Sequence, residues 1–161
     1  MPRLPDGHPW ALPDAAAGAD PAFARLHAFW LARTDGDRLP ARADFQPTDL
    51  PADLLPFIAL IAVEGDAAGR RYRIRLQGSA LHAVTGRNET GRYYDEVTEP
   101  AGYAVIARLL GEAVEQRRPV FLAAPSATVQ RSFLNFGRLG LPLAADGRTV
   151  DMILALVRPL P

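Results

Sequence analysis

The sequence contains no group of residues with the types and spacing that catalysis requires. Its aspartates, glutamates and tyrosines are scattered, and none of its three histidines accompanies a nucleophile. The chain contains no cysteine, which excludes a thiol nucleophile, a thiolate zinc site, a disulfide and a photochemical cysteine adduct. We therefore expect no catalytic residues, no metal site and no enzymatic activity.

A loop from Gly86 to Arg92 reads G-x-x-x-x-G-R, one residue away from a phosphate-binding loop. A loop of that class follows a strand, opens a helix and uses a lysine to reach the terminal phosphates. Here a predicted helix precedes the loop, and arginine replaces lysine. We interpret the segment as a structural turn in which Gly86 and Gly91 adopt backbone angles that other residues avoid.

Several side chains in the second half of the chain are candidates for a ligand-binding pocket between a sheet and its helices. Small-molecule sites commonly combine aromatic walls with few polar groups. The candidates are His82, Tyr93, Tyr94, Tyr103, Phe133 and Asn135. Two interpretations stay open, because the aromatic residues also suit core packing and His82 also suits the surface of a helix.

Two arginines, Arg73 and Arg75, lie on the polar side of a predicted alternating strand. They can fix the N-terminal connector to the sheet by pairing with one of three aspartates, or they can hold an anionic ligand. The aspartates are Asp44, Asp49 and Asp53. We favour the structural pairing.

Composition and charge predict a single soluble globular domain. The chain has 161 residues, 48% of them hydrophobic and 22% charged. Its 18 basic and 18 acidic residues balance, which argues against a nucleic-acid or anionic-membrane partner. The longest apolar run, Phe57 to Val63, is far shorter than the roughly 20 residues that span a bilayer. We expect a cytoplasmic protein.

The first part of the chain divides into a tail, a helix and a connector. Residues 1–20, rich in proline and small residues, predict a flexible tail, and residues 21–47 predict the helix and connector. Asp20 and Pro21 are typical of a helix start, and the helix is expected to end near Asp35. Its apolar stripe consists of Phe23, Leu26, His27 and Trp30. This stripe must pack on the protein's own sheet or on a second copy, so we expect an interface and a homodimer there.

Hydrophobic patterns from residue 48 onward predict short helices, one long helix and five strands. The predicted strands span residues 57–64, 70–77, 120–124, 132–143 and 149–157, and the predicted helices span residues 48–55, 79–85 and 100–117. In the second strand, Tyr72, Ile74 and Leu76 alternate with Arg71, Arg73, Arg75 and Gln77. The order predicts an α+β fold, in which a five-stranded antiparallel sheet carries helices on one face and the N-terminal helix on the other or on a partner.

Several segments, in their order along the chain, resemble the PAS domain, and in particular short bacterial proteins made of little besides a PAS domain. They are Phe29-Trp30 with Arg33, residues 39–44 (L-P-A-R-A-D), residues 49–51 (D-L-P), residues 54–56 (L-L-P), residues 72–79 (Y-R-I-R-L-Q-G-S), residues 85–92 (T-G-R-N-E-T-G-R), and residues 141–143 (L-P-L) leading to 150–152 (V-D-M). The resemblance spans about residues 23–157, and we assign the PAS-like domain to residues 48–161.

The resemblance implies a sensory or protein-docking module of bacterial two-component signalling, with a PAS-type sheet. Its partner would be a small molecule, a histidine kinase or another signalling protein, and no particular cofactor is implied. A haem-binding PAS domain would be expected to carry a histidine on its long helix, and residues 100–118 contain none. Flavin adduct formation is excluded, because Glu89 follows Asn88 where the cysteine would be expected.

Two alternatives belong to other classes. A small α+β barrel enzyme acting on a small apolar substrate also combines helices with a curved sheet, but it would place its long helices before most of its strands. This chain places two predicted strands before its long helix. An adaptor with a filled core would bind no ligand at all.

Overall fold

The computed structural model describes residues 4–125 and 135–161 of the chain. The helices are α1 (Asp14–Ala19), α2 (Pro21–Leu31), α3 (Ser79–Thr85), α4 (Tyr94–Val97) and α5 (Pro100–Gln116). The strands are β1 (Ile58–Glu64), β2 (Arg71–Gln77), β3 (Val120–Pro125), β4 (Asn135–Leu143) and β5 (Met152–Leu160). Three short 3-10 helices, Arg42–Asp44, Pro47–Asp49 and Leu55–Phe57, lie between α2 and β1.

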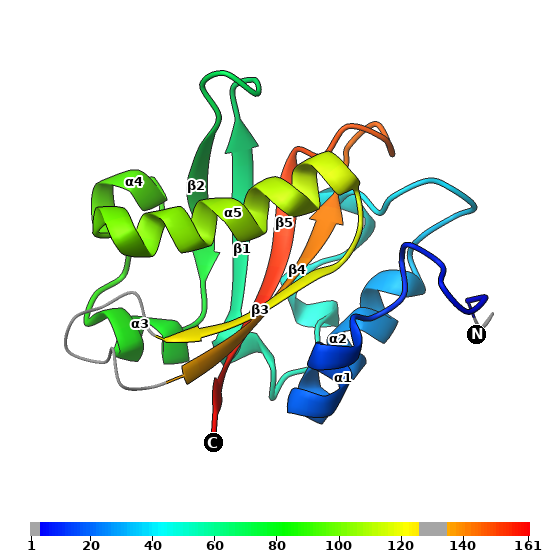
Figure 1. Cartoon of the computed structure of the whole chain (residues 1–161), viewed down its shortest axis with the longest axis horizontal. Coiled ribbons are helices and arrows are strands. Elements are labelled where there is room, and N and C mark those ends of the chain that lie inside the picture. The colour runs from blue at the N-terminus through cyan, green and yellow to red at the C-terminus, as the bar shows by residue number, and fades with distance from the viewer. Residues whose placement is uncertain (1–3, 126–134) are drawn as a thin grey trace.

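The strands form one open antiparallel sheet in the order β2-β1-β5-β4-β3. Hairpin turns join β1 to β2 and β4 to β5, and they contain Gly65 and Gly147 with left-handed φ values of 82° and 81°. The connection from β2 to β3 carries α3, α4 and α5, and α5 lies across the strands (Figure 1). The predicted α+β fold with a five-stranded antiparallel sheet is therefore confirmed.

Neighbouring residues of β4 point to opposite faces of the sheet. A Cβ atom on Gly137 would lie 2.8 Å from the ring of Phe23 in α2. Phe136 and Arg138, on either side of Gly137, line a hollow together with Ile106 of α5. The sheet is therefore covered by α5 on one face and by α2 on the other, as expected for an N-terminal helix that packs on its own sheet.

The start of α2 follows from its sequence, whereas the helix ends earlier in the chain than expected. The Asp20 carboxylate accepts a hydrogen bond from the Ala22 N–H at 2.8 Å, and Pro21 occupies the first turn. The helix ends at Leu31, four residues before Asp35, because the Thr34 hydroxyl and the Thr34 N–H both donate to the Leu31 carbonyl. Such local bonds favour a turn over a continued helix.

Part of the segment for which the sequence predicts a flexible tail, residues 4–19, holds α1 and a buried tryptophan. The Trp10 ring meets Trp30 edge to face with 5.7 Å between ring centroids, and its indole N–H donates to the Arg117 carbonyl at 2.9 Å. The His27 ring nitrogen Nε2 lies 2.7 Å from the Trp10 carbonyl oxygen. The division of the chain into a tail, a connector and a domain from residue 48 stays a prediction.

The burial of His27 predicts a loss of stability in mild acid. Burial lowers the pKa of this imidazole below its usual value, and the hydrogen bond that Nε2 donates to the Trp10 carbonyl opposes this shift only in part. The unfolded chain therefore binds a proton near pH 6.5, where the folded protein resists it. The contribution of neutral His27 to the free energy of unfolding should be fully present above this pH and should decline as the pH falls below it.

Urea unfolding at several pH values between 5 and 8 checks this prediction against the variant His27→Gln. Glutamine keeps an N–H donor and does not titrate, and the variant retains His8, which lies beside Trp10. The free energy of unfolding should fall more steeply towards pH 5 for the wild type than for the variant. If the free energy of unfolding has the same pH dependence in the two proteins, the lowered pKa of His27 is not the cause of the loss.

The connector contains a correction to the predicted secondary structure. The sequence predicts a helix over residues 48–55, but the backbone forms the separate 3-10 helices Pro47–Asp49 and Leu55–Phe57. Pro51 is the physical reason, because the residue before a proline is disfavoured in helical conformation, and Leu50 is extended with φ −70° and ψ 148°. The Asp49 carboxylate instead accepts the Gln46 N–H at 2.7 Å.

The ends of β5 and α5 differ slightly from the predicted ranges. Strand β5 begins at Met152 instead of Thr149, because the Asp146 carboxylate binds the N–H groups of Arg148 and Thr149 and closes a turn. Helix α5 ends at Gln116, where Arg117 adopts a left-handed φ of 52° and its Nε donates to the Arg148 carbonyl at 2.6 Å. Residues 132–134 of the predicted fourth strand lie outside the described part of the chain.

Candidate functional site

The candidate site is a cavity of about 110 Å³ between the sheet and the helices α3, α4 and α5. Its apolar lining consists of Leu81, Val84, Ile106, Phe136 and Val157. Its polar lining consists of Gln77, Thr85, Glu89, Tyr94 and Arg138. An apolar cavity with a few polar groups is the usual form of a small-molecule site.

Gln77 reaches the cavity because β2 contains a bulge. Leu60 of β1 pairs with Leu76, but the next residue of β1 pairs with Ile74, so that Arg75 is left over as the extra residue. Beyond this point the alternation is reversed. Leu76 lies on the same face as its partner Leu60, whereas Gln77 lies on the face of Ile74 and lines the cavity. The prediction that Gln77 shares a face with the arginines of β2 is therefore wrong.

Glu89 is one of the few buried charged residues, with 5% of its surface exposed. The Gln77 side chain accepts the Glu89 N–H at 2.7 Å and donates to its carboxylate at 3.4 Å. Arg87 donates to the other carboxylate oxygen at 3.2 Å. The carboxylate is thus held from two sides, and the loop that follows α3 is fixed to the end of β2.

Tyr94, the first residue of α4, lines the cavity, and its hydroxyl lies within electrostatic range of Glu89 and Arg138. Burial raises the pKa of Tyr94, and the negative charge of Glu89 raises it further, whereas the charge of Arg138 acts in the opposite direction. The hydroxyl therefore stays protonated at neutral pH and is available as a hydrogen-bond donor.

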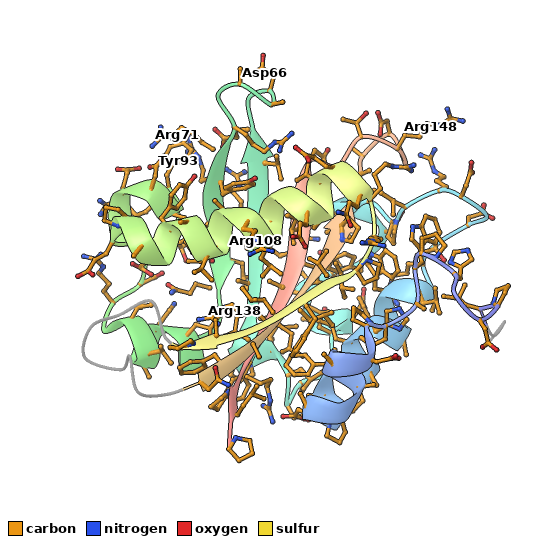
Figure 2. All side chains as sticks on the ribbon, in the orientation of Figure 1. Asp66, Arg71, Tyr93, Arg108, Arg138 and Arg148 are labelled. Carbon is orange, nitrogen blue, oxygen red and sulfur yellow. The ribbon has the colours of Figure 1, made fainter. Side chains whose placement is uncertain are left out.

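Arg138 projects from β4 and is labelled in Figure 2. Its Nη1 donates to the carbonyls of Ala124 and Phe136 at 3.0 and 3.2 Å, and its Nη2 donates to the Pro125 carbonyl at 3.2 Å. Burial lowers the pKa of Arg138, although a guanidinium keeps its charge at neutral pH. The cavity wall therefore contains a cation that is held by carbonyl groups.

The predicted ligand-binding residues do not all meet in this cavity. Tyr94 lines it, and whether it binds a ligand stays a prediction. His82 lies on α3, where its Nε2 is buried without a hydrogen-bond partner among the described residues. Asn135 is exposed at the start of β4, and Phe133 lies outside the described residues. Burial raises the pKa of Tyr103, which lies on α5 within electrostatic range of Asp95 and Arg71.

Tyr93, Arg71 and Arg73 form a cluster at the outer edge of β2, away from the cavity. Figure 2 shows Arg71 beside Tyr93, and the guanidinium carbon lies 3.6 Å from the ring centroid. Arg73 donates to the Tyr93 hydroxyl and pairs with Glu64 at 2.9 Å, and the Tyr93 hydroxyl donates to Glu64 at 2.7 Å. The Tyr93 hydroxyl and Arg73 hold the pKa of the Glu64 carboxyl below its usual value.

The predicted pairing of the β2 arginines with the connector is therefore wrong. Asp53 pairs with Arg25 of α2 at 2.6 Å. Asp44 and Asp49 instead accept backbone N–H groups within the connector itself. These partners are available without bringing the connector to β2, whereas Glu64 of β1 lies directly across the hairpin from Arg71 and close to Arg73.

The four predicted interface residues are buried inside the chain. Phe23 and Leu26 are fully buried, Trp30 is 1% exposed and His27 is 8% exposed. The Phe23 ring meets Phe121 edge to face at 5.1 Å, and the Trp30 indole donates to the Pro142 carbonyl at 2.8 Å. The stripe therefore packs on the β3–β4 side of the protein's own sheet.

Comparison with protein families places most of the chain in one of them. The family of the PAS domain matches residues 19–158. This chain belongs to the PAS domain family. The matched region includes α2, strands β1 to β4, most of β5 and the cavity, so the PAS domain of this chain contains both layers that cover the sheet. A search of curated proteins found no match for the chain.

The family supports a general role as a sensory or interaction module. Within residues 4–125 and 135–161, no helix combines the length and the apolar character needed to cross a membrane. Across the same residues, histidines, aspartates and glutamates form no group that could hold a metal ion.

Proposed function

We propose that this PAS domain is a sensory or protein-interaction module of bacterial signal transduction. A small molecule in the cavity, or a partner protein, changes the packing of α2 against the sheet, and α2 passes this change to another protein. The proposal places the protein in the cytoplasm and in a two-component system. It includes a histidine kinase or another signalling protein as the partner.

The observation that carries the proposal is the position of β4 between the two layers. Phe136 and Arg138 of this strand line the cavity, while Gly137 between them contacts the Phe23 ring of α2. The missing side chain of Gly137 allows this close approach. A ligand that displaces β4 by a few tenths of an ångström would therefore change the contact with α2, because packed interiors transmit small displacements.

Both tryptophans of the chain lie in the N-terminal layer, which provides a direct test. The Trp30 indole binds the Pro142 carbonyl of β4, and the Trp10 indole binds the Arg117 carbonyl at the end of α5. We expect a small molecule that enters the cavity to shift the two indole N–H resonances in a ¹⁵N–¹H correlation spectrum. The probes are n-butanol, n-butylamine, sodium butyrate and 2-butanone, each with four carbon atoms.

Backbone amide resonances of residues 136–138 serve as the control, because they report occupancy of the cavity itself. Saturating shifts of these amides without any movement of the indole resonances would contradict transmission to α2. If none of the four probes moves the amides, the small-molecule part of the proposal fails, and only recognition of a partner protein remains.

A homodimer is also part of the proposal, but it needs a surface other than the one expected. The apolar stripe of α2 is buried in its own chain, so it cannot pack on a second copy in this conformation. Sedimentation equilibrium of the wild-type protein measures the mass directly. A monomer at high micromolar concentration would remove the homodimer from the proposal.

We propose a non-enzymatic role because the cavity residues that the structure describes include no nucleophile next to a base. Its ionisable groups are Glu89, Tyr94 and Arg138, and the Glu89 carboxylate is already bound by Gln77 and Arg87. The alternative of an α+β barrel enzyme on a small apolar substrate also lacks support, because the sheet is open with β2 and β3 at its edges. Turnover of any of the probe molecules would overturn this part of the proposal.

A further inference from the structure

The guanidinium of Arg138 lines the cavity without a carboxylate partner. No ion pair joins it to an acidic group within residues 4–125 and 135–161. The remaining residues, 1–3 and 126–134, contain neither aspartate nor glutamate, so they cannot supply one. A partly buried cation that is bound only by carbonyl groups is an unfavourable arrangement unless an anion joins it.

With respect to residues 4–125 and 135–161, the hydrogen bonds of Arg138 leave one edge of the guanidinium available. Its Nη1 donates to two carbonyls and its Nη2 donates to one, which accounts for three of its five N–H groups. Among the described residues, the Nε–H and the second N–H of Nη2 make no hydrogen bond. A carboxylate commonly binds an arginine through two parallel N–H donors of this kind.

Other residues of the cavity restrict the ligand further. The protonated Tyr94 hydroxyl provides another donor, and Leu81, Ile106, Phe136 and Val157 provide apolar walls. Because a cavity of about 150 Å³ holds the six carbons of benzene, a cavity of about 110 Å³ has room for a chain of about four carbon atoms. These features suit a short hydrocarbon chain with one carboxylate.

Glu89 excludes a second carboxylate on the ligand. Its own carboxylate faces the same cavity, and its cationic neighbour Arg87 is already paired with it at 3.2 Å. A dicarboxylate would therefore bring a second negative charge near Glu89 without a free cation to accept it. The charges of the cavity favour a monocarboxylate.

We infer that the cavity binds a small aliphatic monocarboxylate of about four carbon atoms, with its carboxylate on Arg138 and its hydrocarbon chain against Ile106, Phe136 and Val157. This inference rests on the proposed function, because it assumes that the cavity holds a small molecule. It adds the chemical class of that molecule and the residue that selects it.

Titration of the purified wild-type protein with four probes of similar length tests the inference. Sodium butyrate, n-butanol, n-butylamine and sodium succinate differ chiefly in charge, and the amide resonances of residues 136–138 report their binding. Butyrate should bind about 10- to 100-fold more tightly than n-butanol, as a charge-assisted pair of hydrogen bonds predicts. n-Butylamine and succinate should bind more weakly than butyrate.

The variant Arg138→Met removes the charge and keeps most of the side-chain volume, so the chain should fold and the cavity should persist. We expect it to lose the preference for butyrate and to keep n-butanol binding. Arg108→Met is the matched control, because the Arg108 side chain is 82% exposed on α5. If Arg138→Met does not fold, Tyr94→Phe tests the second donor, and its butyrate affinity should fall several-fold.

The outcomes separate this inference from the proposed function. If n-butanol binds as tightly as butyrate, or if Arg138→Met keeps the preference for butyrate, the inference is wrong while the cavity remains a ligand site. If no probe binds at all, the inference and the small-molecule part of the proposed function both fail. A clear preference for succinate would overturn the exclusion of dicarboxylates by Glu89.

Discussion

Replacing Trp30 with alanine is expected to reduce the free energy of unfolding by about 4 kcal/mol. The Trp30 side chain is 1% exposed and packs against Trp10 at 5.7 Å and His27 at 5.9 Å between ring centroids. The substitution leaves a large cavity and removes the indole donor of the buried Pro142 carbonyl. Because a domain of this size is stable by about 5–15 kcal/mol in total, the loss would be a large fraction.

Urea unfolding followed by circular dichroism measures this loss. Trp30→Phe is the milder variant, because it keeps an aromatic ring and removes only the N–H and part of the volume, so it should cost about 1–2 kcal/mol. Val105→Ala on α5 is the control, since Val105 is 37% exposed and should change stability by less than about 0.5 kcal/mol. A cost for Trp30→Ala as small as that of Val105→Ala would show that α2 is not part of the core.

Replacing Gly78 with alanine is expected to destabilise the protein by about 3 kcal/mol. Gly78 lies between β2 and α3, and its N–H donates to the Ile58 carbonyl at 2.8 Å. A Cβ atom there would lie 2.2 Å from the Pro56 carbonyl oxygen and 2.6 Å from that of Leu55. Both are backbone atoms, so relief of the contact requires the chain itself to move.

The cause of this effect is the contact and not the backbone conformation, because Gly78 has φ −63° and ψ 155°, which alanine adopts readily. Gly69→Ala is the matched control, since a Cβ atom on Gly69 would meet no atom within 4 Å beyond its chain neighbours, and its φ is not left-handed. We expect Gly69→Ala to leave the thermal midpoint nearly unchanged and Gly78→Ala to lower it by well over about 5 °C. Equal midpoints would mean that the Gly78 segment adapts freely.

Sequence patterns predict the elements of this fold well where local signals decide them. The cap at Asp20, the alternation in β2 and the long amphipathic pattern of α5 each act over a few residues, and each element lies where the sequence places it. The order of these elements, with two strands before and three after the long helix, is sufficient to predict the sheet. The connector is predicted less well, because Pro51 interrupts an otherwise helical pattern.

The polar residues of the cavity could not be predicted in the same way. Gln77 enters the cavity only because β2 holds one residue more than β1 at Arg75, and strict alternation places it on the other face. Glu89 and Arg138 line the same cavity although they are remote in sequence, and nothing in the local pattern of either one indicates it. The sequence gives one local indication that Glu89 is held in place, which is its position two residues after Arg87 in the short loop between Gly86 and Gly91.

The left-handed Arg117 at the end of α5 has a mechanical consequence. Its carbonyl holds the Trp10 indole, and its guanidinium holds the Arg148 carbonyl in the turn between β4 and β5. One residue thus ties together three segments that are remote in sequence, around the end of the sheet. If the end of helix α5 moved away from the sheet, the hydrogen bond that holds Trp10 of the N-terminal segment would be strained. The two layers that cover the sheet are therefore linked directly at Arg117 as well as through β4.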